Sequence, residues 1–401
     1  MKLSRLADAF SRPRSAFNRS AKAFALLAVA LLVVCVVAVS AQPPQVTVQL
    51  AAVRPIEPPD HPLPPEADSA GVTRFSFLAY GDTRGQADGL ELQTAHTAVV
   101  DGMLAKIKSL ASTPFPVRFV VSSGDAVTSG RDGKGWNVSF TPIVERLTRG
   151  AGLPYFFAVG NHDVTGMPAG DPGRMLGLHN TLSAISKLVP PEGSPRRMNG
   201  YPTYAVGFGN VFVIAMDSNI AADVAQLAWV TDQLEHLDRA RFIHVIAAFH
   251  HPVFSSGPHG GKTLEPATQA IRTLYEPLFR KHHVRMTVTG HDHLFDHWVQ
   301  RYDDNGVSYR MDDIVTGGGG APTYTYQEEP NVDAYVAVGA SQGVRVVHLA
   351  KPGMTRATNP FHFVVVQVDG GQLSLEVVAV GGATFVPYGG QSRVNLSDKP
   401  S

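Results

Sequence analysis

The stretch RFSFLAYGDTR, residues 74–84, joins an apolar run of strand length to a glycine and then to charged side chains. The run lacks strict polar alternation, which is typical of a strand that is covered on both faces. The glycine that follows it marks the end of the strand. The polar group therefore stands at the carboxyl end of a buried strand, and the same succession recurs along the chain.

Apolar runs of strand length alternate with segments of helical period. This alternation predicts an α/β fold. The expected strands are Phe75–Tyr80, Phe119–Ser122, Tyr155–Val159, Val211–Met216, Phe242–Phe249 and Arg285–Thr289, and the expected helices are Leu92–Leu110, Met175–Leu188, Val224–Leu237 and Ala267–His282. After Trp298 the chain is β-rich, and Asp369-Gly370-Gly371 predicts a hairpin between Phe361–Val368 and Leu373–Val380. We expect one domain over residues 71–385.

Five of the expected strand ends carry polar residues of the types that serve as metal ligands. They are Gly81-Asp82-Thr83-Arg84, Gly124-Asp125, Gly160-Asn161-His162-Asp163, His250-His251-Pro252 and Gly290-His291-Asp292-His293. Loops at the carboxyl ends of strands in open α/β sheets meet in one crevice. A single aspartate in such a place is more often a turn former or a helix cap. Five such sites in series instead favour a centre for zinc, iron or manganese.

These motifs, in this order, resemble those of the calcineurin-like metallophosphoesterase superfamily, nearest to its purple acid phosphatase-like branch. The resemblance covers residues from Phe75 to Trp298. It implies a four-layer α/β/β/α sandwich with two mixed β-sheets and a dinuclear metal site at the carboxyl ends of the strands. It also implies two divalent ions, with iron, zinc and manganese as the candidates.

The resemblance assigns ligands position by position. One ion would be held by Asp82, Asp125 and His293, and the other by Asp125, Asn161, His250 and His291, so that Asp125 bridges the two. His162 matches the histidine that serves as proton donor or charge stabiliser at the ester oxygen. His259, within HHPVFSSGPHG (250–260), is similar in position to a second active-site histidine of the purple acid phosphatases, and it is otherwise an ordinary loop histidine.

Two positions depart from the family pattern. Arg84 stands where many members have a histidine ligand, and an arginine stays protonated and does not ligate. We expect Arg84 to clamp the substrate phosphate, with a surface ion pair as the alternative. Thr128 stands where the purple enzymes have an iron-binding tyrosine, so we expect no purple centre and a more weakly held first ion.

The expected function is hydrolysis of a small phosphate-ester substrate by a metal-activated water. A phosphomonoesterase is the preferred interpretation. One alternative is a phosphodiesterase acting on cyclic or nucleoside diesters or on lipid headgroups. The other is a non-catalytic protein that binds phosphate or a partner through a depleted first metal site.

Residues 1–41 have the pattern of a signal peptide, with six basic residues followed by the apolar run Ala23–Val39. We therefore expect an exported protein, periplasmic or extracellular, and the alternative is an N-terminal membrane anchor through residues 23–41. The lone cysteine, Cys35, lies in that run, so the rest of the chain has no disulfide. Residues 42–70 contain eight prolines and predict a linker, and residues 386–401 predict a flexible tail.

The charge balance argues against a nucleic-acid partner. Without the six basic residues and one acidic residue of 1–41, the chain has 28 basic and 33 acidic side chains, a net charge of −5. Proteins that bind nucleic acid usually carry a basic surface. We therefore expect a small-molecule substrate.

Overall fold

The computed structural model describes residues 52–164 and 170–396, all of which belong to one compact unit, Leu50–Ser401. A six-stranded sheet has the order β13-β12-β11-β1-β2-β3. Its parallel part carries the first three motifs, and its antiparallel part comes from the end of the chain. The strands are β1 (Arg74–Tyr80), β2 (Val117–Ser122), β3 (Tyr155–Phe157), β11 (His362–Asp369), β12 (Gln372–Ala379) and β13 (Arg393–Asn395).

A seven-stranded sheet has the order β10-β8-β9-β7-β6-β5-β4. Strands β5, β6, β7 and β9 are parallel neighbours, while β4, β8 and β10 run antiparallel to their partners. The strands are β4 (Tyr204–Phe208), β5 (Val211–Ala215), β6 (His244–Ala248), β7 (Met286–Thr289), β8 (Phe295–Asp304), β9 (Val307–Thr316) and β10 (Arg345–Ala350).

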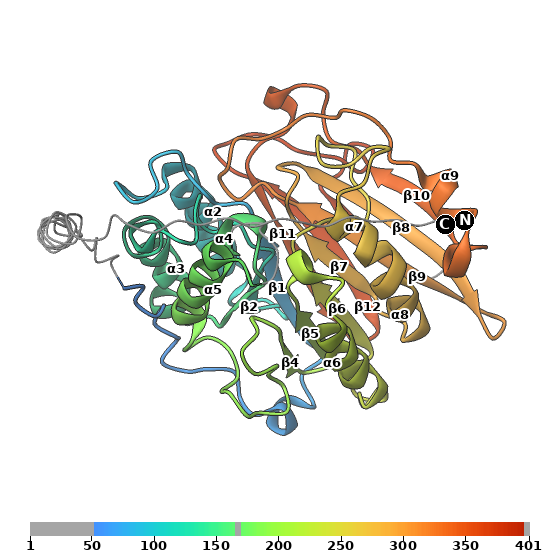
Figure 1. Ribbon diagram of the computed structural model, residues 1–401, viewed down its shortest axis with the longest axis horizontal. Coiled ribbons are helices and arrows are strands. Elements are labelled where there is room, and N and C mark those ends of the chain that lie inside the picture. The colour runs from blue at the N-terminus through green and yellow to red at the C-terminus, as the bar shows by residue number, and fades with distance from the viewer. Residues whose placement is uncertain (1–51, 165–169, 397–401) are drawn as a thin grey trace, which may run out of the picture. The chain divides into compact units, whose positions relative to one another are not determined.

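Helices flank both sheets, so the described chain has four layers (Figure 1). On the six-stranded sheet lie α2 (Thr94–Leu110), α3 (Thr141–Glu145), α4 (Asn161–Val164) and α5 (Pro172–Ile185); on the other sheet lie α6 (Val224–Glu235), α7 (Pro266–Ala270) and α8 (Glu276–Lys281), and α9 (Val332–Val336) lies near β10. The described chain also contains short 3₁₀ or π-helical segments. They are η1 (Glu66–Ser69), η2 (Gly135–Phe140), η3 (Arg146–Gly150), η4 (Ser218–Ile220), η5 (Ile271–Tyr275), η6 (Gly339–Ser341) and η7 (Arg356–Thr358).

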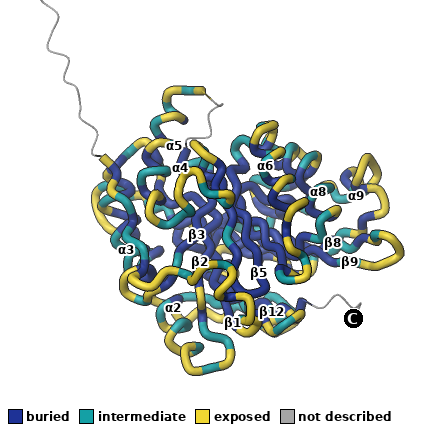
Figure 2. Tube along the Cα trace, turned by 90° about the horizontal axis from the view of Figure 1, so that it is seen from below, coloured by how far each residue is buried: buried dark blue, intermediate teal, exposed yellow. Residues whose placement is uncertain are grey.

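Three apolar clusters separate the four layers. Phe77 and Phe119 of the first sheet pack with Ile246 of the second between the two sheets. A second cluster lies under α2, α3 and α5, and a third lies under α6 and α8. Figure 2 shows the strands as a buried centre with exposed loops around it. Full burial of one such aromatic side chain contributes roughly 1.5–3 kcal/mol to the stability of the fold. The cluster between the sheets therefore holds the two sheets, and the strand ends that carry the motifs, in place.

The predicted α/β class, with two mixed sheets and flanking helices, is confirmed. The predicted strands before each motif and the predicted hairpin are present within a residue or two at each end. Helix 267–282 is present as α7, η5 and α8. The predicted β-rich character after Trp298 is present, although β8, β9 and β10 were not predicted as individual strands. The helical segment 135–150 and strand β4 were not predicted.

The expected linker, residues 42–70, is corrected for its described part. Ile56 is fully buried in the cluster under α5, and its backbone N–H donates to Ala184 O at 2.8 Å. The side chain of Arg54 pairs with Glu145. The prolines do keep this segment out of regular α-helix. Its apolar side chains pack on the surface of the domain, so residues 52–70 belong to the domain.

The expected flexible tail, residues 386–401, is corrected in the same way for residues 386–396. Strand β13 pairs with β12, and Leu396 is buried between the sheets. The predicted signal peptide or anchor, residues 1–41, lies outside the described residues, as do residues 397–401. Over residues 52–164 and 170–396, no helix combines the length and the apolar character that crossing a bilayer requires.

Candidate metal centre

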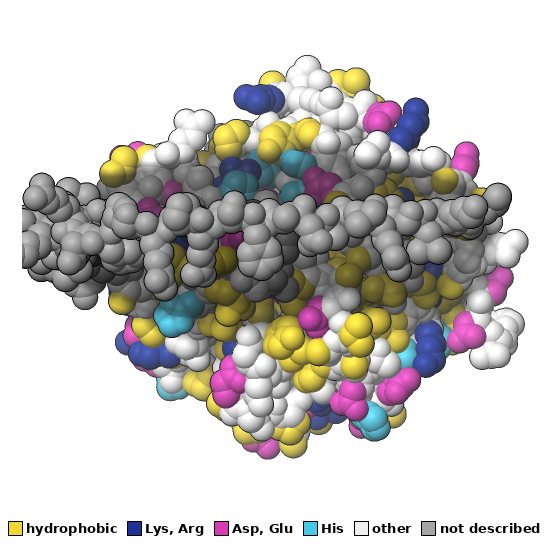
Figure 3. All heavy atoms as spheres, viewed as in Figure 1, with side chains coloured by type: hydrophobic (Ala, Val, Ile, Leu, Met, Phe, Trp, Pro, Cys, Tyr) yellow, Lys and Arg dark blue, Asp and Glu magenta, His cyan; other side chains and the backbone are white. Residues whose placement is uncertain are grey.

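The predicted ligands meet where the two sheets present the carboxyl ends of their parallel strands. Asp82 follows β1, Asp125 follows β2, and Asn161 begins α4 after β3. From the other sheet, His250 follows β6, and His291 and His293 follow β7. Figure 3 shows histidine, acidic and basic side chains gathered on the face that it draws.

Three of these residues hold a backbone conformation that is unusual for anything but glycine. The φ angles of Asp82, Asp125 and His291 are 60°, 54° and 70°. A non-glycine residue in this left-handed region costs roughly 1–2 kcal/mol. Sharp turns directly after the strands direct these side chains toward one another. The backbone strain at the three residues is therefore associated with assembly of the cluster.

Two of the motif glycines are required by close contact. A Cβ on Gly290 would lie 2.2 Å from Asp82 Oδ2, and a Cβ on Gly160 would lie 2.1 Å from Asp125 Oδ1. Any larger residue at these positions would displace a carboxylate. These two glycines therefore make room for an aspartate that comes from another strand.

One group of four side chains directs acceptor atoms at a common point. Asn161 Oδ1 lies 2.9 Å from His250 Nε2 and 3.1 Å from His291 Nδ1, and these two nitrogens are 3.1 Å apart. Asp125 Oδ1 is 3.4 Å from His250 Nε2. We call Asp125, Asn161, His250 and His291 the four-ligand group.

The tautomers in the four-ligand group follow from the other ring nitrogens. His250 Nδ1 donates to Ser123 O at 2.9 Å, and His291 Nε2 donates to Glu265 Oε2 at 3.0 Å. Each ring therefore presents a lone pair, not a proton, to the common point. Lone pairs that converge on each other and on a carbonyl oxygen repel unless a cation lies among them, so this group fits a divalent metal ion.

The second set of predicted ligands, Asp82, Asp125 and His293, also lies together. His293 Nε2 is 3.5 Å from Asp82 Oδ1, and His293 Nδ1 donates to Pro322 O at 2.8 Å. Arg84 lies among these groups: its Nε is 3.4 Å from Asp125 Oδ2 and its Nη2 is 3.3 Å from His293 Nε2. We call Asp82, Asp125 and His293 the arginine-filled group, because a fixed cation already contacts two of its three members.

Burial and charge set the protonation of the cluster. Burial lowers the pKa of His250 to about 3 and that of His293 to about 4, so both rings are neutral at pH 7. Burial opposes ionisation of Asp125, but His250, His162 and Arg84 outweigh it and hold the pKa of Asp125 well below its ordinary value. Burial and the charge of Asp125 raise the pKa of Asp82.

The predicted catalytic histidine, His162, lies at the rim of the cluster. Its Nδ1 donates to Thr128 O at 2.8 Å, and its Nε2 lies 4.0 Å from Asp125 Oδ2. The side chain is 31% exposed, so a molecule that reaches Asp125 from solvent meets this ring. His251, the neighbour of His250, instead contacts Ser218 Oγ at 2.8 Å.

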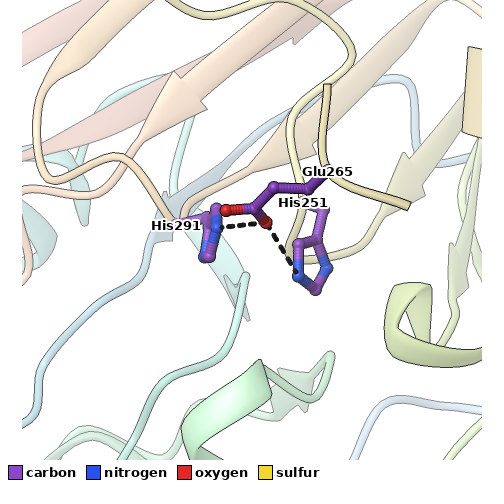
Figure 4. A group of neighbouring side chains, drawn as sticks. All are labelled: His251, Glu265 and His291. Atoms are coloured by element: carbon purple, nitrogen blue, oxygen red, sulfur yellow. Dashed lines mark hydrogen bonds and ion pairs between the residues drawn. The ribbon is translucent and has the colours of Figure 1, made fainter. Parts of the chain in front are cut away.

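Sequence reasoning missed Glu265, which stands just before α7. Figure 4 shows its carboxylate between His291 and His251, and its other oxygen accepts from His259 Nδ1 at 2.9 Å. The ring of His259 packs on that of His291, with 4.2 Å between ring centroids. Hydrogen bonds from His259 and His291 lower the pKa of Glu265, and the hydrogen bond to Glu265 raises that of His259. The available signal was only an acidic residue six positions after His259.

Sequence reasoning also missed the role of Asp163 as the organiser of the turn after β2. Its carboxylate accepts from the backbone N–H groups of Asp125 and Gly160, both at 2.8 Å, and of Ala126 at 2.9 Å. These three contacts hold the Gly-Asp and Gly-Asn-His motifs to each other. Its place in the Asn-His-Asp motif was visible, but Asp125 and Ala126, from which its carboxylate accepts, lie 38 and 37 residues away along the chain.

Comparison with known proteins places the chain among phosphoesterases. The model of the calcineurin-like phosphoesterase family matches residues 75–295, more than half of the chain. No curated protein matches the sequence. A purple acid phosphatase from yellow lupin seeds has a similar structure, with a TM-score of 0.54 and 17% identity over 82% of this chain. The chain spans about half of that protein, 54% of its length.

Two further solved structures match with lower scores. GAP50, the anchor in the inner membrane complex of Plasmodium, has a TM-score of 0.47 and 14% identity over 78% of this chain and 87% of its own. PhoD has a TM-score of 0.43 and 11% identity over 78% of this chain and 67% of its own. At these identities the likenesses describe the fold, and the chemistry depends on the residues of this chain.

Proposed function

The chain belongs to the calcineurin-like phosphoesterase family, and from this premise we propose that it is a metal-dependent hydrolase with a preference for phosphate monoesters. The family assigns it to the phosphoric ester hydrolases. The observation that carries the metal dependence is the four-ligand group, in which three acceptor atoms lie within 3.1 Å of one another without a donor between them.

The sequence predicts a dinuclear centre in which Asp125 joins the two ligand groups, and the proposed hydrolysis requires at least the ion of the four-ligand group. Asp125 Oδ1 faces the four-ligand group and its Oδ2 faces the arginine-filled group. Asp125, Asn161, His250 and His291 would hold a divalent ion, which would supply Lewis-acid chemistry for the phosphate oxygens and for activation of water. The metal identities that the sequence favours are zinc, iron and manganese.

The residues at the rim suit a phosphoryl group with two negative charges. Arg84, His162 and His259 all approach the cluster, and the hydrogen bond to Glu265 favours the charged form of His259. A monoester carries one more negative charge on its phosphoryl group than a diester does. His162, held through Nδ1, would pass a proton from Nε2 to the departing ester oxygen.

Export and a small-molecule substrate are proposed from the sequence. Residues 1–41 support export, periplasmic or extracellular, with an N-terminal anchor as the alternative. The net charge of −5 over the remaining residues supports a substrate other than nucleic acid.

The test compares two chromogenic esters with the purified protein loaded with Zn²⁺ or Mn²⁺. We expect a higher kcat/KM for 4-nitrophenyl phosphate than for bis(4-nitrophenyl) phosphate. The His162→Ala variant should lose roughly 10²–10⁴-fold in kcat, since it lacks the proton donor, and should keep its metal. His179→Ala, an exposed histidine on α5, is the matched control.

Each outcome decides one part of the proposal. A preference for the diester would contradict the monoester assignment. Hydrolysis of neither ester by the metal-loaded protein would favour the non-catalytic alternative, a protein that only holds phosphate or a partner. Unchanged turnover in His162→Ala would remove that histidine from the mechanism.

A further inference from the structure

Arg84 departs from the family pattern within the centre itself. It stands two residues after Asp82, at the position where the resemblance leads one to expect a histidine ligand. Its backbone is fixed, because the N–H groups of Thr83 and Arg84 both donate to Asp125 O, at 3.0 and 3.2 Å. These backbone hydrogen bonds place the Cα of Arg84 beside Asp125 independently of any bound substrate.

The guanidinium of Arg84 is directed into the cluster. Its side chain is 21% exposed, its Nε contacts Asp125 Oδ2 at 3.4 Å, and its Nη2 contacts His293 Nε2 at 3.3 Å. Because His293 Nδ1 donates to Pro322 O, the Nε2 that faces Arg84 carries a lone pair. Arginine thus donates to the two atoms that a first metal ion would need as ligands.

Charge and ligand count point the same way. With arginine in place of histidine, the arginine-filled group offers Asp82, Asp125 and His293 and has a cation among them. A divalent ion there would meet a guanidinium at close range in a buried site, where like charges repel strongly. The four-ligand group has no such cation between its acceptor atoms and keeps all four ligands.

We infer that the guanidinium of Arg84 takes the place of the first metal ion, so that the protein holds one ion, in the four-ligand group. The inference rests on the proposed function only for that one ion. Asp125 then bridges a metal ion and an arginine instead of two metal ions. This makes Arg84 a built-in positive charge of the centre, in place of the phosphate clamp that the sequence predicts.

The test counts metal ions per chain, independently of hydrolysis. Protein loaded with Mn²⁺ and freed of excess ion by gel filtration should contain about one ion per chain. Its paramagnetic resonance spectrum should show the six lines of an isolated Mn²⁺. The Arg84→His variant, which restores the common ligand, should contain about two ions and show the broadened spectrum of a coupled pair. Arg118→His, at an exposed position on β2, is the matched control and should contain one ion.

A second pair of variants tests the assignment of the groups. His293→Ala should leave the count at one in the natural sequence, because His293 then holds Arg84 and no ion. The same change made together with Arg84→His should reduce the count from two to one. His250→Ala should bring the count close to zero in the natural sequence and should reduce it from two to one in the Arg84→His background.

Two ions per chain in the natural sequence would overturn the inference and favour the clamp. One ion in Arg84→His would overturn it as well, since arginine would then not be what keeps the second ion out. If the natural protein contains one ion and Arg84→His contains two, but the metal-loaded natural protein hydrolyses neither ester, the proposed function is contradicted and the inference about Arg84 still holds.

Discussion

A single carboxylate, that of Glu265, connects three histidines of the centre. It accepts from His291 and His259 and lies 3.9 Å from His251 Nε2. Through His291 it fixes which ring nitrogen is turned toward the four-ligand group. Carboxylates that hold ligand histidines in this way commonly change metal affinity tenfold to a hundredfold when they are replaced.

We predict that Glu265→Gln weakens binding of Zn²⁺ by about ten- to a hundredfold, because the amide neither matches the charge of the carboxylate nor accepts from both rings. Competition with a chelator of known affinity measures the dissociation constant. Glu328→Gln serves as the control, because Glu328 lies in the same region and pairs only with exposed Lys262 at 3.7 Å or with its backbone N–H. Equal affinity in Glu265→Gln and the natural sequence would show that Glu265 does not hold His291 for the ion.

At the scale of elements, strands β7, β8 and β9 are joined by a buried charge cluster that contains none of the predicted ligands. Asp312 of β9 accepts from Arg285, just before β7, and from His297 of β8 at 2.8 Å. Arg285 also donates to Leu396 O, which ties the end of the described chain to this sheet. Burial opposes ionisation of Asp312, but Arg285, His297 and Arg310 outweigh it and hold its pKa well below its ordinary value.

This lowered pKa makes the stability of the sheet depend on acid. A carboxylate whose pKa falls on folding stabilises the fold above its unfolded pKa, near 4, and loses that contribution as pH falls toward the folded pKa. We predict that Asp312→Asn lowers the free energy of unfolding by about 3–5 kcal/mol at pH 7. The difference from the natural sequence should narrow below about pH 4.

Urea unfolding of both proteins at several pH values between 3 and 7 measures this difference. Asp369→Asn is the control, because its pair with Arg74 is exposed and contributes at most about 1 kcal/mol. A difference that stays constant across the whole range would mean that the ionised form of Asp312 is not what stabilises the strands.

At the scale of the whole molecule, the sequence predicts the parallel core and the ligand residues because both are local signals. An apolar run followed by Gly-Asp identifies a strand and its end within a dozen residues. The individual strands β8 and β9 were missed because they mix charged residues such as Asp312 with apolar ones, which gives no clear strand pattern. Asp312 is nevertheless buried, because Arg285 and Arg310 form ion pairs with it.

The ends of the domain were harder to predict for a related reason. Residues 52–70 and 386–396 are rich in proline, glycine and polar residues, yet Ile56 and Leu396 are buried in two different clusters. A few apolar side chains in an irregular segment show neither the helical nor the strand periodicity from which burial can be predicted. Similarly, the positions of Glu265 and Asp163 in the centre depend on pairings between distant segments, which only the folded chain displays.

We propose that Asp125 makes this junction of two sheets a metal-dependent hydrolytic site. Asp125→Asn keeps the shape of the side chain but removes its charge, and metal content and hydrolysis of 4-nitrophenyl phosphate are measured on the same sample. We expect both to fall together to near background, with circular dichroism unchanged and the exposed Asp333→Asn variant unaffected. Near-normal turnover in Asp125→Asn, or normal metal content without turnover, would contradict the account.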